Sequence, residues 1–497
     1  MSEQGAALRA STIVPDANAL ADASENRPEL FALVLLAVAL ALGAFLRFEH
    51  LRRPDLSADE GATWAAASQP TANEVILKEH QFDPGKLPVY DLLLHGWMRG
   101  FGEDVVAMRA MSAALGTLAI ALVFAAVRES CRSLGADTDG IDGNLAGAFA
   151  ALIYAVSFMT VASDRTLRMY PLEVGAELAQ IIFLVRAARH HGWLNYAGTA
   201  VFTALMIAAN FTASFLLLGE AIWLGCLLVG RLRGPQKNGL LIFQPALSVI
   251  AGVAILSPWL PAAFASSRMA VAVGALDWIK MQPPWWPYIV LSAAARGRFL
   301  FWSFLGFAAF AVWRYWRSSP ALVGFFAAWT LGPFLGVMAV TYLVRPLEFP
   351  RYALIGCIGM YAFAGFGAAS LRTHSRRVNM SIRLGITGAL IWLSFVPTHH
   401  KLRHPYEADW RGAAQVAVDI AAPDETIAVF PRFCANVVRY YVPPARRSSV
   451  LGQDVCGSPR VLVLTGHDII SEDQMSAMER CYPRVVKRLM LVEVRTR

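Results

Sequence analysis

Residues 30–64 read LFALVLLAVALALGAFLRFEHLRRPDLSADEGATW. The run starts with an uncharged apolar stretch close to the roughly 20 residues that a helix needs to cross a bilayer core. It continues into a polar segment in which two carboxylates, Asp59 and Glu60, are adjacent. Acidic side chains so close to the end of a membrane-spanning helix indicate that chemistry takes place at the membrane surface.

The rest of the chain is equally apolar. Of its 497 residues, 56% are hydrophobic and 16% are charged, and the mean hydropathy is +0.46. The hydrophobic fraction and the mean hydropathy lie above those of soluble proteins and the charged fraction lies below, so we predict an α-helical polytopic membrane protein with about eleven transmembrane helices. The predicted spans are 30–46, 105–127, 144–162, 171–186, 194–209, 211–230, 240–257, 298–313, 320–343, 350–370 and 382–398.

Basic residues predict the orientation of these spans. Lys and Arg in short loops resist translocation. Thirteen lie in the loops on the same side as the N-terminus, and four lie in the short connections on the other side. We therefore predict an inner (plasma) membrane protein with a disordered cytoplasmic tail, 1–29, and a retained signal anchor. The topology accounts for the net charge of +8, so no nucleic-acid partner is expected.

Three regions interrupt or follow the spans. Segments 47–104 and 258–297 are too long to be turns and are predicted to be outer loops of a transmembrane domain over 30–400. From 401 to 497 the composition is that of a small extracytoplasmic α/β domain. TIAVFP, RVLVLTG and RLMLVEVRT read as strands there, and WRGAAQVAVDIAAP and DQMSAMERCYP read as helices. In an oxidising compartment one cysteine pair can close, with Cys434–Cys456 as the first choice and Cys481 left over.

Charged residues concentrate at span ends and in outer loops, and few lie inside the spans. Carboxylates occur in the first loop and cations in the later ones: Asp59, Glu60, Asp83, Lys86, Arg165, Arg168, Arg345, Glu348 and Arg351. A carboxylate that takes a proton from a hydroxyl, beside cations that hold a phosphate, suits substitution on a phosphate-activated substrate. A lipid-linked phosphate would reach such a site from the bilayer, which explains the many spans.

Four stretches resemble a known family. They are LSADEGATW (56–64), GKLPVYDLLLHGWMRGFGEDVVAMR (85–109), SDRTLRMYPLEV (163–174) and RPLEFPRYAL (345–354). Together they are similar to motifs of the GT-C integral-membrane glycosyltransferases, in particular the protein O-mannosyltransferases and the lipid A aminoarabinose transferases (glycosyltransferase family 39-like). The resemblance covers roughly residues 30 to 400. One departure is Leu87, which stands where many relatives have a proline.

The resemblance implies roles for individual residues. Asp59 is expected to be the general base and Glu60 to support it, with Arg109 at the start of the second span. The donor phosphate is expected to bind Lys86, Arg168, Tyr170, Arg351 and Tyr352. The implied donor is a polyprenyl-phosphate-linked sugar, and the acceptor is a hydroxyl of a glycan, lipid or protein, with inversion at the anomeric carbon. No cofactor is expected, although the family is compatible with a divalent cation; no metal-ligand spacing appears.

Two other functions fit a polytopic chain. A transporter or flippase of a lipid-linked substrate would have broken spans and charges near the middle of the membrane, and Pro245 and Pro333 are candidates for kinks. A structural membrane protein whose outer domain recruits an enzyme would leave the converging acidic and basic loops without a role. The glycosyltransferase interpretation uses these loops and is favoured.

Overall fold

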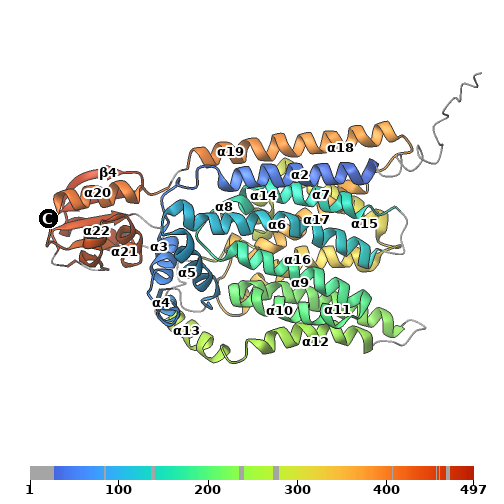
Figure 1. Cartoon of the computed structure of the whole chain (residues 1–497), viewed down its shortest axis with the longest axis horizontal. Helices are drawn as coiled ribbons and strands as arrows, with labels where there is room; N and C mark the ends of the chain where they lie inside the picture. Colours follow the sequence, from blue (N-terminus) through green and yellow to red (C-terminus); the bar gives the residue numbers. More distant parts are fainter. Residues whose placement is uncertain are drawn as a thin grey trace, which may run out of the picture.

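The computed structural model describes residues 27–82, 86–135, 140–233, 240–272, 279–405, 407–454, 456–457, 459–465 and 471–497. A bundle of long helices forms one part of the molecule and a small sheet domain lies beyond one end of it (Figure 1). The first helix begins at Arg27, inside the predicted tail, and residues 1–26 lie outside the described ranges. The predicted fold class, a helical membrane protein with a small C-terminal sheet domain, is confirmed.

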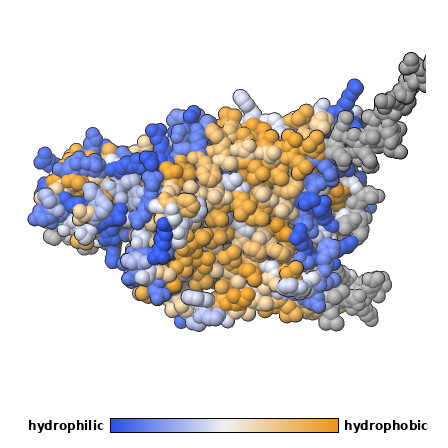
Figure 2. Space-filling view, viewed as in Figure 1, coloured by the Kyte–Doolittle hydropathy of each residue, from blue (hydrophilic) through white to orange (hydrophobic). Residues whose placement is uncertain are grey.

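The bundle consists of helices on which all eleven predicted apolar runs fall. They are α2 (Arg27–Phe48), α6 (Val105–Leu134), α7 (Gly143–Val156), α8 (Phe158–Asp164), α9 (Tyr170–His190), α10 (Trp193–Ala209), α11 (Ser214–Arg233), α12 (Leu240–Ile255), α15 (Arg298–Tyr315), α16 (Pro320–Leu343), α17 (Leu354–Ala369), α18 (Arg376–Leu390) and α19 (Val396–Arg403). Among the described residues, six helical segments are long and apolar enough to cross a membrane, or eight if each of two bent pairs is one span. Apolar residues form a band across the bundle, with hydrophilic residues at both ends (Figure 2). The chain is built as a multi-pass membrane protein.

The bends occur where the sequence did not predict them. Helices α7 and α8 meet at 66°, and α14 (Trp286–Ala294) meets α15 at 98°. The hydroxyl of Thr160 donates to the carbonyl oxygens of Tyr154 and Ser157, at 2.6 and 3.0 Å, so the first break leaves these backbone groups satisfied. Pro245 and Pro333, by contrast, lie inside the unbroken helices α12 and α16.

A buried ion pair fastens the first break to the first helix. Arg47, near the end of α2, contacts Asp164, the last residue of α8, at 2.7 Å, and neither side chain is exposed. Tyr154 also donates to the Asp164 carboxylate. A buried carboxylate needs such partners because desolvation of an isolated charge costs several kcal/mol. The pair therefore fixes the position of α8 against α2.

Acidic residues inside the bundle are a second departure from expectation. Glu173 and Glu177 on α9 and Glu220 on α11 are buried, although charges were expected mainly at span ends. Glu173 accepts hydrogen bonds from Asn210 and Thr212. Glu173 lies in the first turn of α9, at a span end, so Glu177 and Glu220 are the exceptions on these two helices to the expected position of charges.

The two long loops are mostly helical. The first contains α3 (Ala58–Ala67), α4 (Ala72–Phe82) and α5 (Val89–Phe101), which lie between the bundle and the sheet domain (Figure 1). The second contains α13 (Leu260–Ala272) and α14. Helix α3 starts at Ser57 with a capping box: the Ser57 hydroxyl accepts from the Glu60 N–H, and the Glu60 carboxylate accepts from the Ser57 N–H.

The C-terminal domain is a five-stranded mixed sheet with helices. Its strands are β1 (Ile427–Phe430), β2 (Val450–Gly452), β3 (Val461–Thr465), β4 (Arg484–Leu489) and β5 (Val492–Thr496), in the order β2-β1-β3-β5-β4. Its longer helices are α20 (Trp410–Ile420), α21 (Ala435–Tyr441) and α22 (Glu472–Cys481). The prediction of one strand in RLMLVEVRT is wrong, because the chain turns there, with Leu491 at a positive φ of 58°, and pairs β4 with β5. Strand β2 and helix α21 were not predicted.

The predicted disulfide is also wrong in its partner. Cys456 is bonded to Cys481, at the end of α22, with 6.1 Å between their Cα atoms. Cys434 is a free thiol buried just before α21, and burial raises its pKa. A thiol that stays protonated is a poor nucleophile, so the leftover cysteine is a packing residue.

Candidate active site

The two adjacent carboxylates of the opening motif have different environments. Glu60 is buried and forms a two-pronged ion pair with Arg109, at 2.8 Å to Nε and 2.7 Å to Nη2. It also accepts from the backbone N–H of Leu167 at 2.8 Å. Burial raises the pKa of Glu60, but Arg109 and the N–H donors outweigh that effect and hold it below its usual value. A carboxylate so fully engaged is a structural anchor.

Arg109 ties Glu60 to the loop before it. Its Nη1 donates to the carbonyl oxygens of Leu51 and Pro54, and its Nη2 also donates to that of Asp55. These bonds hold the polypeptide between α2 and α3 in a fixed path. Because Glu60 and Asp59 share one turn of α3, the same contacts determine where Asp59 lies.

Asp59 points toward the cations of the later loops. Its Oδ2 lies 3.5 Å from Nη1 of Arg351, which is 292 residues away in the sequence, and its side chain is 57% exposed. Arg351 also donates to the Tyr170 hydroxyl at 3.2 Å and lies over the rings of Tyr170 and Phe349. The structure thus brings together Asp59, Tyr170 and Arg351 from three separate motifs.

Arg168 and Tyr352 flank this group. Arg168 is buried, donates to the Thr63 hydroxyl at 3.3 Å, and is near enough to Arg351 for their charges to repel. Tyr352 lies in the same short 3₁₀ turn as Arg351, and its ring contacts that of Phe349. Two guanidinium groups that repel each other are an arrangement that an anion would stabilise.

Lys86 occupies a different environment from the one predicted. It is 7% exposed, and its Nζ lies 3.2 Å from a carboxylate oxygen of Glu79 on α4 and 3.2 Å from one of Asp91 on α5. Both carboxylates are buried. Lys86 therefore joins α4 to α5. Asp83, another candidate, lies outside the described residues.

Other candidate cations and acids have structural contacts. Arg165 donates to the carbonyl oxygens of Leu46, Arg47 and Glu49, so it caps the end of α2. Burial lowers its pKa to about 10, which leaves it charged at neutral pH. Glu348 is buried and accepts from the Gln282 N–H at 2.6 Å.

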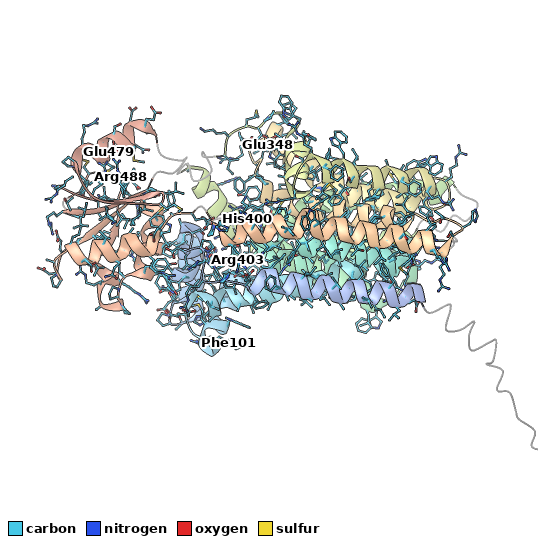
Figure 3. All side chains as sticks on the ribbon, turned by 90° about the horizontal axis from the view of Figure 1, so that it is seen from above. Phe101, Glu348, His400, Arg403, Glu479 and Arg488 are labelled. Carbon is cyan, nitrogen blue, oxygen red and sulfur yellow. A yellow bond between two sulfur atoms is a disulfide. The ribbon has the colours of Figure 1, made fainter. Side chains whose placement is uncertain are left out.

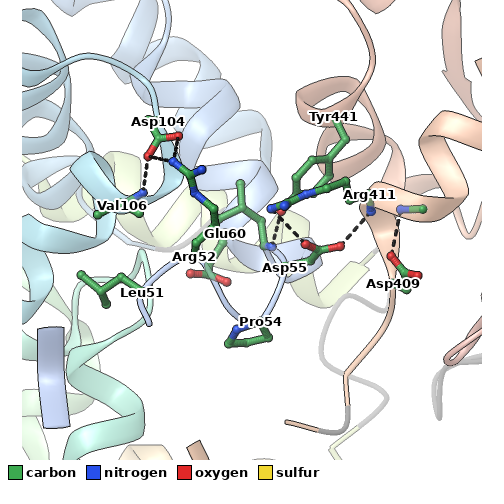
Figure 4. Close-up of polar contacts among 12 residues, drawn as sticks. Leu51, Arg52, Pro54, Asp55, Glu60, Asp104, Val106, Asp409, Arg411 and Tyr441 are labelled. Atoms are coloured by element: carbon green, nitrogen blue, oxygen red, sulfur yellow. Dashed lines mark hydrogen bonds and ion pairs between the residues drawn. The ribbon is translucent and has the colours of Figure 1, made fainter. Parts of the chain in front are cut away.

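The C-terminal domain packs directly on α3 and on the segment before it, a contact that was not predicted from the sequence. The carboxylate of Asp55 accepts from the backbone N–H of Arg411 and pairs with its guanidinium, and the Tyr441 hydroxyl accepts from the Leu56 N–H (Figure 4). A Cβ at Gly61 would lie 2.6 Å from the backbone nitrogen of Val437 on α21. The only sequence signal was the composition change after 399, which says nothing about docking.

Chemically, the site offers one accessible carboxylate beside guanidinium groups, at the end of the bundle that faces the C-terminal domain. Figure 3 shows this end as the junction of the two domains. Within the described ranges, no group of three or more His, Cys, Asp and Glu side chains is arranged to hold a metal ion. The arrangement can accept a proton and bind an anionic group at neighbouring positions.

Comparison with known proteins gives the fold. No family model matches the chain, and no curated protein sequence matches it. Among solved structures it is similar to ArnT from Cupriavidus metallidurans bound to undecaprenyl phosphate, with 13% identity, a TM-score of 0.60 and coverage of 94% of this chain and 97% of that one. It is also similar to the oligosaccharyltransferase AglB from Archaeoglobus fulgidus, in complex with an inhibitory peptide and a dolichol-phosphate, with 10% identity, a TM-score of 0.56 and coverage of 88% and 69%. The fold predicted from the four motif stretches is confirmed: this chain has the GT-C fold of integral-membrane glycosyltransferases.

Proposed function

We propose that this protein is a membrane glycosyltransferase that moves a sugar from a polyprenyl-phosphate donor to an acceptor hydroxyl on the extracytoplasmic face. The observation that carries the proposal is the meeting of Asp59 with Arg351 and Tyr170, from motifs far apart in the sequence. The two structural relatives support it, because both were solved with a polyprenyl-type phosphate.

In the proposed reaction Asp59 is the general base. Its carboxylate takes the proton of the acceptor hydroxyl, whose oxygen then forms a bond to the anomeric carbon of the sugar. The bond between that carbon and the phosphate oxygen breaks, and its electron pair leaves with the lipid phosphate. One displacement of this kind inverts the anomeric configuration.

Arg351 and Arg168 are the proposed phosphate ligands, with Tyr170 and Tyr352 positioning Arg351. The contact between Asp59 and Arg351 is long, at 3.5 Å, and both side chains are at least 36% exposed. Such pairs contribute only about 0 to 1 kcal/mol. An incoming phosphate therefore displaces Asp59 from Arg351 at little cost and leaves the carboxylate free to accept a proton.

Glu60 supports Asp59 by fixing α3 through Arg109. Lys86 is a phosphate ligand in this proposal only if donor binding draws it away from Glu79 and Asp91. Otherwise its role is to join α4 to α5.

The transporter alternative is not favoured by any relative. The two bent helix pairs and the carboxylates on α9 and α11 are features that it would use. However, both bends and buried acids are compatible with the GT-C fold that the chain has. The site of Asp59 has no role in that alternative.

The test is transfer from a panel of labelled polyprenyl-phosphate sugars by the purified protein in proteoliposomes. Asp59→Asn is expected to lower the transfer rate by about 10²- to 10⁴-fold, the usual contribution of a general base. Arg351→Ala is expected to weaken donor binding. The matched control is Asp419→Asn, an exposed acid on α20 whose carboxylate contacts only Gln415 within the described residues. Full activity of Asp59→Asn would overturn the proposal.

A further inference from the structure

A basic groove lies where two lipid-facing helices leave the apolar band, apart from the site around Asp59. The juxtamembrane groove is lined by His50, Arg53, Leu402, Arg403 and His404 and has a volume of 320 Å³. His50 and Arg53 follow α2, and the other three residues end the run α18–α19. We propose that this groove binds the phosphate headgroup of an anionic membrane lipid.

The charge of the groove favours a phosphate. Within the described part of the chain, the guanidinium of Arg53 makes no hydrogen bond or ion pair, and the side chain is exposed. Glu49 contacts the side chains of Arg403 at 3.4 Å, His399 at 2.8 Å and His50 at 3.3 Å, so its negative charge is shared among them. The two guanidinium groups of Arg53 and Arg403 outnumber this one carboxylate, so the groove has net positive charge.

A neighbouring cavity of 710 Å³ shares His50 and Arg53 with the groove and contains more acids. Of these, Asp55 is paired with Arg411, and Asp409 caps α20 by accepting from the Gly412 N–H. Glu407 also lines this cavity but not the groove. The basic end of the combined cavity is therefore the end beside α2 and α19.

The position of the groove favours a lipid over a soluble phosphate. Arg403 and His400 lie at the junction of the bundle with the C-terminal domain (Figure 3). On the bundle side of this junction, Phe48, Trp392 and Val396 are exposed apolar side chains on the two converging helical runs. The helices pack together here, with the rings of Phe45 and Phe395 at 6.2 Å. A phospholipid whose phosphate lies in the groove would place its acyl chains against these apolar side chains.

The experiment titrates the purified full chain with phosphatidylglycerol or phosphatidylcholine and counts retained lipids by native mass spectrometry. Arg53→Gln is expected to weaken phosphatidylglycerol binding about fivefold, and Arg53→Gln with Arg403→Gln about 25-fold, since each cation near an anionic lipid contributes about 1 kcal/mol. The matched control is Arg484→Gln with Lys487→Gln, two exposed cations on β4 of the C-terminal domain. It is expected to bind like the wild type.

Three outcomes would overturn the proposal. The first is retention of phosphatidylcholine equal to that of phosphatidylglycerol, and the second is unchanged phosphatidylglycerol binding in the double variant. The third is binding of glycerol phosphate as tight as that of phosphatidylglycerol, which would make this a site for a soluble anion. Arg53→Gln removes no side-chain hydrogen bond or ion pair among the described residues, so the variant is expected to fold like the wild type. A thermal melt checks this. No sugar donor is present, and Asp59→Asn is expected to bind lipid normally. Failure of the lipid site is thus distinguishable from failure of the proposed glycosyltransferase function.

Discussion

Replacing each of the two adjacent acids with its amide separates an anchor from a reacting group. In Glu60→Gln the side-chain oxygen keeps its place, and an NH₂ group replaces Oε2. That NH₂ then faces two donors, the Ser57 N–H and Arg109 Nη2. In the native protein these donors lie 2.8 and 2.7 Å from Oε2 of Glu60. Arg109 also loses its only carboxylate contact among the described side chains.

The expected cost for Glu60→Gln is about 3 to 5 kcal/mol of unfolding free energy, the usual penalty for removing one partner of a buried ion pair. The substitution is nearly isosteric, so no cavity adds to it. Asp59→Asn loses only a partly exposed contact at 3.5 Å. Its cost is expected to stay below about 1 kcal/mol.

The assay is equilibrium unfolding of both purified variants in mixed micelles with increasing SDS, followed by tryptophan fluorescence, with transfer measured on the same preparations. We expect Asp59→Asn to be stable and inactive, and Glu60→Gln to unfold at lower SDS. If Glu60→Gln proved as stable as the wild type, the Glu60–Arg109 pair would not hold the loop. If both variants lost stability equally, the division of roles between the two acids would be refuted.

Three further perturbations have defined outcomes. In the folded state the pKa of Glu60 lies below its usual value of 4.5, so its contribution to stability is full above about pH 4.5 and is lost as the pH falls through the folded pKa. Unfolding titrations of wild type and Glu60→Gln should therefore converge at that low pH. Asp164→Asn leaves Arg47 buried without its counter-ion and should lower the unfolding free energy by about 3 to 5 kcal/mol in the same SDS assay; an unchanged midpoint would contradict this. Arg351→Lys keeps the charge but loses the planar contact with Tyr170 and Phe349, so donor affinity, measured by isothermal titration, should fall by about 5- to 30-fold, whereas equal affinity would mean that charge alone suffices.

The helical framework was predictable because the thickness of the bilayer fixes the length of a membrane-spanning helix, and apolar runs of that length can be found in the sequence. All eleven runs fall on helices, although among the described residues only six to eight segments are long and apolar enough to cross a membrane. The bends at Ser157 and between α14 and α15 were not predictable, since neither depends on a proline. At the first break the hydrogen bonds of Thr160 form only after folding, and the second bend passes through Arg296 and Gly297, both at positive φ. The turn between β4 and β5 was missed because the four apolar residues 489–492 run through it without a turn residue.

The site was predictable in part. Asp59, Tyr170 and Arg351 come together as the motif resemblance led us to expect. Contacts between side chains that are far apart in sequence were not accessible: Arg47 meets Asp164 across 117 residues, and Lys86 meets two carboxylates whose burial depends on how α4 and α5 pack. The disulfide partner of Cys456 likewise depended on where α22 ends.

Gly61, the third letter of the Asp-Glu-Gly triplet, belongs to the contact between domains and takes no part in the proposed chemistry. Any side chain there would collide with the backbone of Val437. When homologous sequences are aligned, glycine at this column should therefore follow the presence of the C-terminal domain, while Asp59, two residues earlier, should follow the proposed chemistry. A chain without that domain would be free to vary at this column. Variation at position 61 would then report the gain or loss of the C-terminal domain, independently of variation at position 59.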